Sequence, residues 1–270
     1  MPDSGSWDVV FGAESDPLIL SVGFPLVGRR EAGFAELAAK IGTTKYRFLQ
    51  AKLLSSSPGS WVSGIAYVRH LIDEIRDRPI AAVLGHRVGS VYATALAEGI
   101  SQWQQAPRVI LFNPQFASVR LLGHELHSEI KAISSLLSDD EIARAGKLAA
   151  EIAESVSGDV VDAAAAAAGI YWEISSVAYD RVGIGGTYWR KSFAPFESYM
   201  SLLSAAGQID SSKAWKRSTA IVSFDYQDGP LPVDDARGMV GHSIPFDVSH
   251  TDLLRSDSVA KKVLELLEFL

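Results

Sequence analysis

The feature that most constrains the fold is a five-residue segment, GHRVG (85–89), which joins an apolar run to a helical pattern. The run before it, PIAAVL (79–84), is typical of a strand that is buried on both faces. The residues after it, SVYATALAEGI (90–100), are typical of a helix. Its two glycines allow a sharp turn and a close approach of the helix to the strand. A strand that turns directly into a helix indicates a parallel sheet covered by helices.

Strand and helix patterns alternate through most of the chain in the same way. Strands are predicted at 17–22, 45–53, 79–84, 108–112, 219–224 and 239–248, and helices at 31–41, 61–76, 90–100 and 257–270. The stretch 116–215 has instead a nearly continuous helical periodicity. We therefore predict an α/β core formed by 1–115 and 216–270, with 116–215 inserted as a helical lid. Such an insertion covers the carboxyl ends of the strands, where ligands bind in open sheets of this kind.

The composition excludes several classes of function. With 270 residues, of which 47% are hydrophobic, the chain can bury a core without disulfides or metal. Its 25 Lys and Arg against 32 Asp and Glu leave no broad cationic surface for a nucleic acid. The absence of cysteine removes thiolate metal sites and a Cys nucleophile. His124 and His127 have the spacing of two ligands on one helix, but only Glu125 or Glu129 could join them, so we expect no metal and no cofactor.

Two segments could be mistaken for targeting signals. The first residues have neither the basic start nor the apolar stretch of a signal peptide. The alanine-rich run at 162–169 falls short of the roughly 20 apolar residues that a membrane span needs. We therefore expect a cytoplasmic protein that does not associate with membranes.

Three segments together resemble the thioesterase branch of the α/β-hydrolases, the release and editing enzymes of nonribosomal peptide and polyketide synthesis. SVGFPLVG (21–28) is similar to that family's first turn, GHRVG to its nucleophile elbow and FDVSHTDLL (246–254) to its histidine loop. The resemblance implies an α/β-hydrolase fold over essentially the whole chain. It also implies oxyanion-hole donors at the backbone of Leu26 and Val88. An acyl or peptidyl carrier protein is the implied partner.

The residue at the implied nucleophile position is Arg87 instead of serine. A guanidinium stays protonated and has no lone pair with which to attack a thioester. Serine hydrolysis by this elbow is therefore excluded.

Of the other two catalytic positions that the resemblance implies, the base position holds the family's residue and the acid position does not. His250 stands where the family has its base. The acid position of this branch, at the end of the strand after the elbow helix, holds Asn113, whose neutral amide cannot stabilise an imidazolium as a carboxylate does. Many other α/β-hydrolases have their acid later in the chain, where Asp228 lies. Asp228 also fits a local turn, QDGP, in which Asp is favoured for backbone hydrogen bonding.

An arginine at the start of a helix needs an anion, because the helix dipole disfavours a cation there. The anion could be internal, such as Asp225 or Asp228, or it could belong to a ligand. A ligand anion would favour non-hydrolytic acid–base chemistry (lyase, isomerase or cyclase) with His250 as base and Arg87 as clamp. An internal partner would favour an inactive scaffold that binds a carrier protein or an acyl ligand. The position of the Arg87 guanidinium separates these two hypotheses.

The sequence offers two weaker indications, one of a replacement nucleophile and one of an acyl pocket. A hydrolase with another nucleophile, such as Ser21, stays possible from the sequence, whereas Ser90 is a poor candidate because it points along the helix. The aromatic residues of the lid stretch are expected mainly in core packing, with one or two lining an acyl pocket; they are Trp189, Phe193, Phe196 and Tyr199.

Overall fold

The computed structural model describes residues 5–24, 31–42, 45–52, 63–155, 158–226 and 239–268. The chain divides into two compact units. The first comprises Met1–Leu54, Gly64–Phe116 and Ile209–Leu270, and the second comprises Ser55–Ser63 and Ala117–Gln208. The residues just before 216 therefore belong with the sheet and not with the insertion predicted at 116–215. The reason is local, because Trp215 of helix α8 (Ser212–Trp215) is fully buried and stacks on Phe116 with ring centroids 3.9 Å apart.

The first unit is built on one seven-stranded sheet with the order β1-β3-β2-β4-β5-β6-β7. Its strands are β1 (Trp7–Phe11), β2 (Leu18–Val22), β3 (Arg47–Ala51), β4 (Ile80–His86), β5 (Arg108–Phe112), β6 (Thr219–Ser223) and β7 (His242–Phe246). All neighbouring strands are parallel except β1, which runs antiparallel to β3. The parallel register aligns the strand ends, since Gly85 pairs with both Val22 and Leu111.

Strand β1 is the one element of the sheet that the sequence pattern did not predict. It forms an edge of the sheet, and only Trp7 in it is fully buried. A partly exposed edge strand does not need a continuous apolar run, so its sequence lacks the pattern of the central strands.

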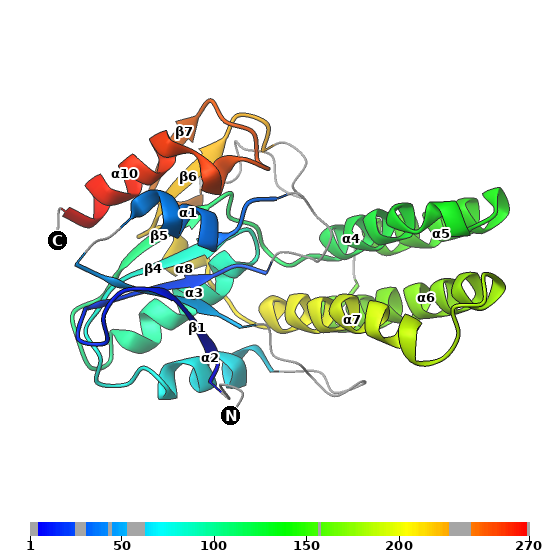
Figure 1. The fold of residues 1–270 in the computed structure, drawn as a ribbon, viewed down its shortest axis with the longest axis horizontal. Helices are drawn as coiled ribbons and strands as arrows, with labels where there is room; N and C mark the ends of the chain where they lie inside the picture. The colour runs from blue at the N-terminus through cyan, green and yellow to red at the C-terminus, as the bar shows by residue number, and fades with distance from the viewer. Residues whose placement is uncertain are drawn as a thin grey trace. The chain divides into compact units, whose positions relative to one another are not determined.

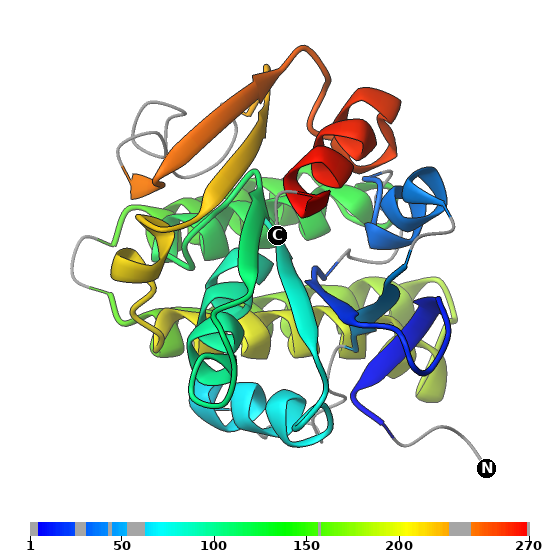
Figure 2. The same ribbon diagram turned by 90° about the vertical axis from the view of Figure 1, so that its left-hand side faces the viewer.

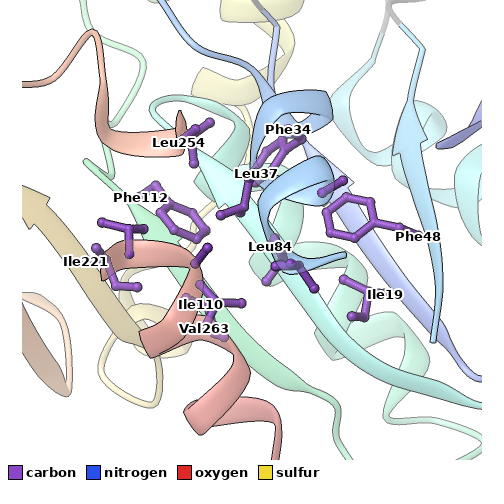
Figure 3. Close-up of a cluster of buried hydrophobic side chains, with 14 of the residues drawn as sticks. Ile19, Phe34, Leu37, Phe48, Leu84, Ile110, Phe112, Ile221, Leu254 and Val263 are labelled. Atoms are coloured by element: carbon purple, nitrogen blue, oxygen red, sulfur yellow. The ribbon is translucent and has the colours of Figure 1, made fainter. Parts of the chain in front are cut away.

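Helices cover both faces of the sheet. Helices α1 (Phe34–Ile41) and α10 (Asp257–Glu268) lie together on one face, and α2 (Gly64–Asp73) and α3 (Gly89–Ile100) lie together on the other (Figures 1 and 2). A core of interlocking apolar side chains fills the space beneath α1 and α10 (Figure 3). Phe34 of α1 packs edge-on against Phe112 of β5, with ring centroids 5.8 Å apart. This contact fixes the start of α1 near the carboxyl end of β5.

The second unit is helical. It contains α4 (Val119–Ala132), the short 3-10 helix η1 (Ser134–Leu136), α5 (Asp139–Ala153), α6 (Val160–Arg181) and α7 (Thr187–Gly207). Helix α4 packs along α5, and α6 packs along α7 (Figure 1). The side chains of Ser118, Ser138 and Asp159 cap the first turns of α4, α5 and α6. None of the helices in the described part of the chain has the length and apolar character to cross a membrane.

Helices α4 and α5 approach so closely that one glycine has no room for a side chain. A Cβ atom on Gly123 of α4 would lie 2.4 Å from the carbonyl oxygen of Ala149 in α5, whereas a Cβ on Gly146 would meet open space. Alanine favours a helix over glycine by about 1 kcal/mol, and overpacking of a tight contact costs about 1–3 kcal/mol. We therefore expect Gly146→Ala to stabilise the protein, and Gly123→Ala to be less stable than Gly146→Ala by about 1–3 kcal/mol. Denaturant unfolding of both variants measures this difference, and equal stabilisation by both would show that the two helices are not in close contact.

Candidate functional site

The turn after β4 has the geometry of a strained elbow. Strand β4 ends at His86, Arg87 has a φ of +52°, and Val88 caps the start of α3. A positive φ is unfavourable for an arginine, so the surroundings must hold it. The two flanking glycines let the neighbouring backbone pack closely around Arg87. A Cβ atom on Gly85 would lie 2.6 Å from the Cα of Ser90, and a Cβ atom on Gly89 would lie 2.1 Å from the carbonyl oxygen of Val22. The elbow therefore presents the side chain at position 87 above the carboxyl end of the sheet.

The backbone of Arg87 is tied to the neighbouring strand. Its N–H donates to the carbonyl of Phe112 over 2.9 Å, and its carbonyl accepts from the N–H of Gln115 over 3.2 Å. The second bond brings the Gln115 side chain alongside, and the Nε of Arg87 donates to Gln115 Oε1 over 2.9 Å. The loop after β5 thus orients the guanidinium at the elbow.

The guanidinium forms an ion pair that the sequence did not predict. Nη1 of Arg87 lies 2.7 Å from Oε1 of Glu31, and both side chains are largely buried, at 20% and 14% exposed. The predicted internal partners were Asp225 and Asp228, but the carboxylate bound to Arg87 is that of Glu31. This pair supplies the anion that a cation at a helix N-terminus requires.

Glu31 is held in place by the segment that leads into α1. The N–H of Ala32 donates to the carbonyl of Thr251 over 2.9 Å, which ties this segment to the loop that carries His250. Helix α1 begins close by, and its Glu36 accepts a hydrogen bond from the N–H of Gly33 over 2.9 Å. Glu31 therefore reaches the elbow from a segment remote in sequence.

His250 is paired with Asp225, which lies just after β6. Its Nδ1 is 2.9 Å from Oδ2 of Asp225, and its backbone N–H donates to Oδ1 over 2.6 Å. Burial raises the pKa of the Asp225 carboxyl, but the hydrogen bonds from His250 and Ser223 and the charge of His250 lower it, so that the pKa lies below its ordinary value. Because Asp225 occupies Nδ1, Nε2 is the ring nitrogen left to exchange a proton. The side chain of His250 is 38% exposed, so solvent or a ligand can reach it.

The two residues predicted to support His250 lie elsewhere or are not described. The side chain of Asn113 bonds to Ser223: Nδ2 donates to the Ser223 hydroxyl over 3.0 Å, and Oδ1 accepts from the Ser223 N–H over 2.9 Å. Asn113 thus joins the ends of β5 and β6. Asp228 lies outside the described residues, as does Leu26, one of the two predicted oxyanion donors. Val88, the other predicted donor, precedes the first turn of α3, where a backbone N–H is not used by the helix itself.

His86 adds a partly buried imidazole to this group. Its ring packs edge-on against Phe34, with ring centroids 6.4 Å apart. Burial lowers the pKa of His86 to about 4; Glu31 opposes this shift, and Arg87 and His250 add to it. His86 is therefore neutral near pH 7, and its electrostatic coupling to these three residues places them in one neighbourhood.

The serines considered as replacement nucleophiles are buried. Ser21 is fully buried and its hydroxyl donates to the carbonyl of Leu49 over 3.0 Å. Ser90 is also fully buried, and its hydroxyl has no hydrogen-bond partner among the described residues. Neither hydroxyl is placed to attack an external substrate.

The arrangement therefore provides the proton-transfer part of serine-hydrolase chemistry but not the nucleophilic part. A base oriented by a carboxylate is assembled at His250 and Asp225, so protons can be moved. The position that the family resemblance assigns to the nucleophile holds the ion-paired guanidinium of Arg87, which has no lone pair with which to attack an acyl carbon. Within the described ranges, no three His, Asp or Glu side chains are grouped in a way that could hold a metal ion.

No protein-family model and no curated protein sequence matches this chain. Solved structures do match it over nearly its whole length. An esterase from Thermogutta terrifontis matches with a TM-score of 0.53 and 14% identity, covering 97% of this chain and 92% of its own. The enol-lactonase from Burkholderia xenovorans matches with a TM-score of 0.52 and 14% identity over 97% and 95%. The NocB thioesterase domain matches with a TM-score of 0.51 and 13% identity over 94% and 95%. The chain therefore has the α/β-hydrolase fold, as the motifs predicted, and these identities show the fold alone.

The low pKa of His86 predicts a pH dependence of stability. An unfolded histidine takes up a proton below about pH 6.5, whereas His86 in the folded protein does so only near pH 4. Stability should therefore fall as the pH drops from about 6.5 to 4, by up to about 3 kcal/mol from this residue alone. Denaturant unfolding at several pH values should show a shallower decline in His86→Gln than in the wild type. Equal declines in both proteins would mean that His86 titrates in the folded state as it does in the unfolded chain.

Proposed function

We propose that this protein is a non-hydrolytic acid–base catalyst that acts on an acyl substrate, a lyase, isomerase or cyclase. The observation that carries the proposal is the pairing of His250 with Asp225, which a mere scaffold would not need. It is given more weight than the ion pair of Arg87 with Glu31, which taken alone favours a scaffold. Proton transfer needs a base and a group that stabilises the protonated form of that base, and the His250 imidazole and the Asp225 carboxylate fill these two roles.

The step requires no covalent intermediate on the protein. Nε2 of His250 takes a proton from the carbon next to the substrate carbonyl, and the electron pair of that C–H bond moves to the carbonyl oxygen as an enolate. The imidazolium that forms is stabilised by the ionised carboxylate of Asp225. The backbone N–H of Val88 supports the developing negative charge on oxygen. Return of the proton to the enolate at the same or a neighbouring atom completes the exchange or isomerisation.

Arg87 has a binding role in this scheme. An anionic group of the substrate would bind the guanidinium by replacing Glu31, and this exchange of one carboxylate for another anion keeps the charge balanced. The Gln115 side chain would hold the guanidinium in the same orientation during the exchange.

The substrate class is inferred from the family resemblance. The first turn, the elbow and the histidine loop resemble those of thioesterases from natural-product synthesis, and the fold is similar to that of a thioesterase domain. These features support an acyl thioester as substrate, carried by an acyl or peptidyl carrier protein. The role in polyketide or nonribosomal peptide synthesis is part of the same proposal.

A second candidate is a protein that binds such an acyl ligand or carrier without chemistry. The Arg87–Glu31 ion pair favours it, because an internal carboxylate already satisfies the elbow cation. The two candidates differ in one measurable property, the exchange of a substrate proton that depends on His250.

Exchange can be followed by NMR in deuterated buffer with the N-acetylcysteamine monothioester of glutarate, whose free carboxylate can take the place of Glu31 on Arg87. We expect the wild-type protein to speed deuteration of the carbon next to the carbonyl without releasing the thiol. His250→Ala should lower this rate by about 10²- to 10⁴-fold, as is usual for loss of a general base. Asp225→Asn should lower it as well, because an amide does not stabilise the imidazolium.

The controls decide between the two candidates. Thermal unfolding of each variant must match the wild type, so that loss of rate is not loss of fold. Saturable binding of the thioester with no protein-dependent deuteration would overturn the catalytic proposal in favour of the binding protein. Deuteration that survives in His250→Ala would show that another group is the base.

A further prediction concerns the residue missing from the elbow. Because Asp225 already supports His250, Arg87→Ser combined with Glu31→Gln should complete a Ser–His–Asp set. We expect this double variant to be labelled covalently by a fluorophosphonate probe, and the wild type to stay unlabelled. Adding His250→Ala should slow the labelling by about 10²-fold or more. Intact-mass spectrometry measures all three proteins, and a folded double variant that resists the probe would show that position 87 does not face His250.

A further inference from the structure

A groove lies between α6 and α7 within the helical unit. It encloses about 460 Å³ and is lined by Ala168, Gly169 and Trp172 of α6 and by Arg190, Phe193 and Glu197 of α7, among others. This volume lies in the range of about 300–1,000 Å³ that is usual for small-molecule sites. The groove exists because small residues stand where the two helices would otherwise fill the space between them.

The walls of the groove are apolar and partly rigid. Trp172 packs edge-on against Phe193 and Trp189, with ring centroids 4.8 and 4.1 Å apart. Trp189 and Phe193 are buried, but Trp172 stays 36% exposed. A large aromatic side chain held by its neighbours and still exposed offers a binding surface that costs little conformational entropy.

The ends of the groove carry opposite charges. Arg190 is exposed and lies over the ring of Trp189, 5.9 Å from its centroid. Glu197 lies seven residues further along α7, which is about 10 Å along a helix. The end at Arg190 therefore attracts an anion.

We propose that this groove binds an anionic amphiphile with a single head group, such as a medium-chain carboxylate. The carboxylate binds Arg190, which presents planar donors suited to it. The alkyl chain lies along Trp172 and Phe193 toward Ala168 and Gly169. The inference does not rest on the proposed acid–base chemistry, because no residue of the groove takes part in it.

The role of the charge can be tested with decanoate and decanol, which share a chain and differ in the head. Each is titrated below its aggregation limit against the full-length protein, and binding is followed by calorimetry and by tryptophan fluorescence. Decanoate should bind more tightly than decanol. Arg190→Gln should weaken decanoate by about tenfold or more and leave decanol nearly unchanged. Equal losses for both ligands, or none, would overturn the assignment of Arg190 as the head-group site.

The role of the groove can be tested with a matched pair of glycine variants. A Cβ on Gly169 meets open space, as does one on Gly146 of α5, so both accept a larger side chain without a backbone clash. Gly169→Leu should fill the groove and abolish decanoate binding, whereas Gly146→Leu should bind like the wild type. Both should keep the wild-type melting temperature or raise it.

Two results would overturn the proposal. Decanoate binding retained in Gly169→Leu would place the ligand elsewhere. A wild-type protein that self-associates, but becomes monomeric in Gly169→Leu, would show that a second copy of the chain occupies the groove. Size-exclusion chromatography with light scattering distinguishes that outcome from the binding of a small amphiphile.

Discussion

The site depends on one constraint, the strained backbone at Arg87. The positive φ at this residue is held by two glycine contacts and by hydrogen bonds to the end of β5 and the loop after it. The same bonds bring Gln115 to the guanidinium, and the packing of Phe34 on Phe112 brings the segment that carries Glu31 to the same edge of the sheet. A cation at the start of a helix is unfavourable by up to about 1 kcal/mol, and the carboxylate of Glu31 offsets this. The backbone geometry thus places the guanidinium of Arg87 at the start of α3, and its positive charge there requires a carboxylate partner.

The fold could be predicted because its signals are local. Buried parallel strands have continuous apolar runs, and their helices have apolar residues at helical spacing, so β2, β4, β5 and α3 are visible in the sequence. Strand β1 is not, because an edge strand that is mostly exposed needs no such run. Residues 209–215 continue the helical pattern of the predicted insertion but lie in the unit that contains the sheet, where Trp215 stacks on Phe116. Helical periodicity shows that a helix exists but not which core it joins.

The site could be predicted only in part, because its pairings join residues that are remote in sequence. Arg87 and His250 were identified by their places in motifs. Asn113 was considered for the acid because it follows β5, but in the structure its amide joins β5 to β6 through Ser223. Asp225 follows β6 almost directly, and that position was the available signal for the partner of His250. No sequence feature pointed to Glu31, except that Arg87 needs an anion nearby.

Each group that carries or gains positive charge at this site has its own carboxylate. Arg87 is paired with Glu31, and His250 is paired with Asp225. Because the two pairs are separate, the arginine at position 87 does not draw Asp225 away from His250. If Asp225 had been drawn to Arg87, the imidazole would have lost the group that orients it and stabilises its protonated form. The presence of Glu31 therefore explains how an elbow without a serine can coexist with a histidine that is oriented for proton transfer.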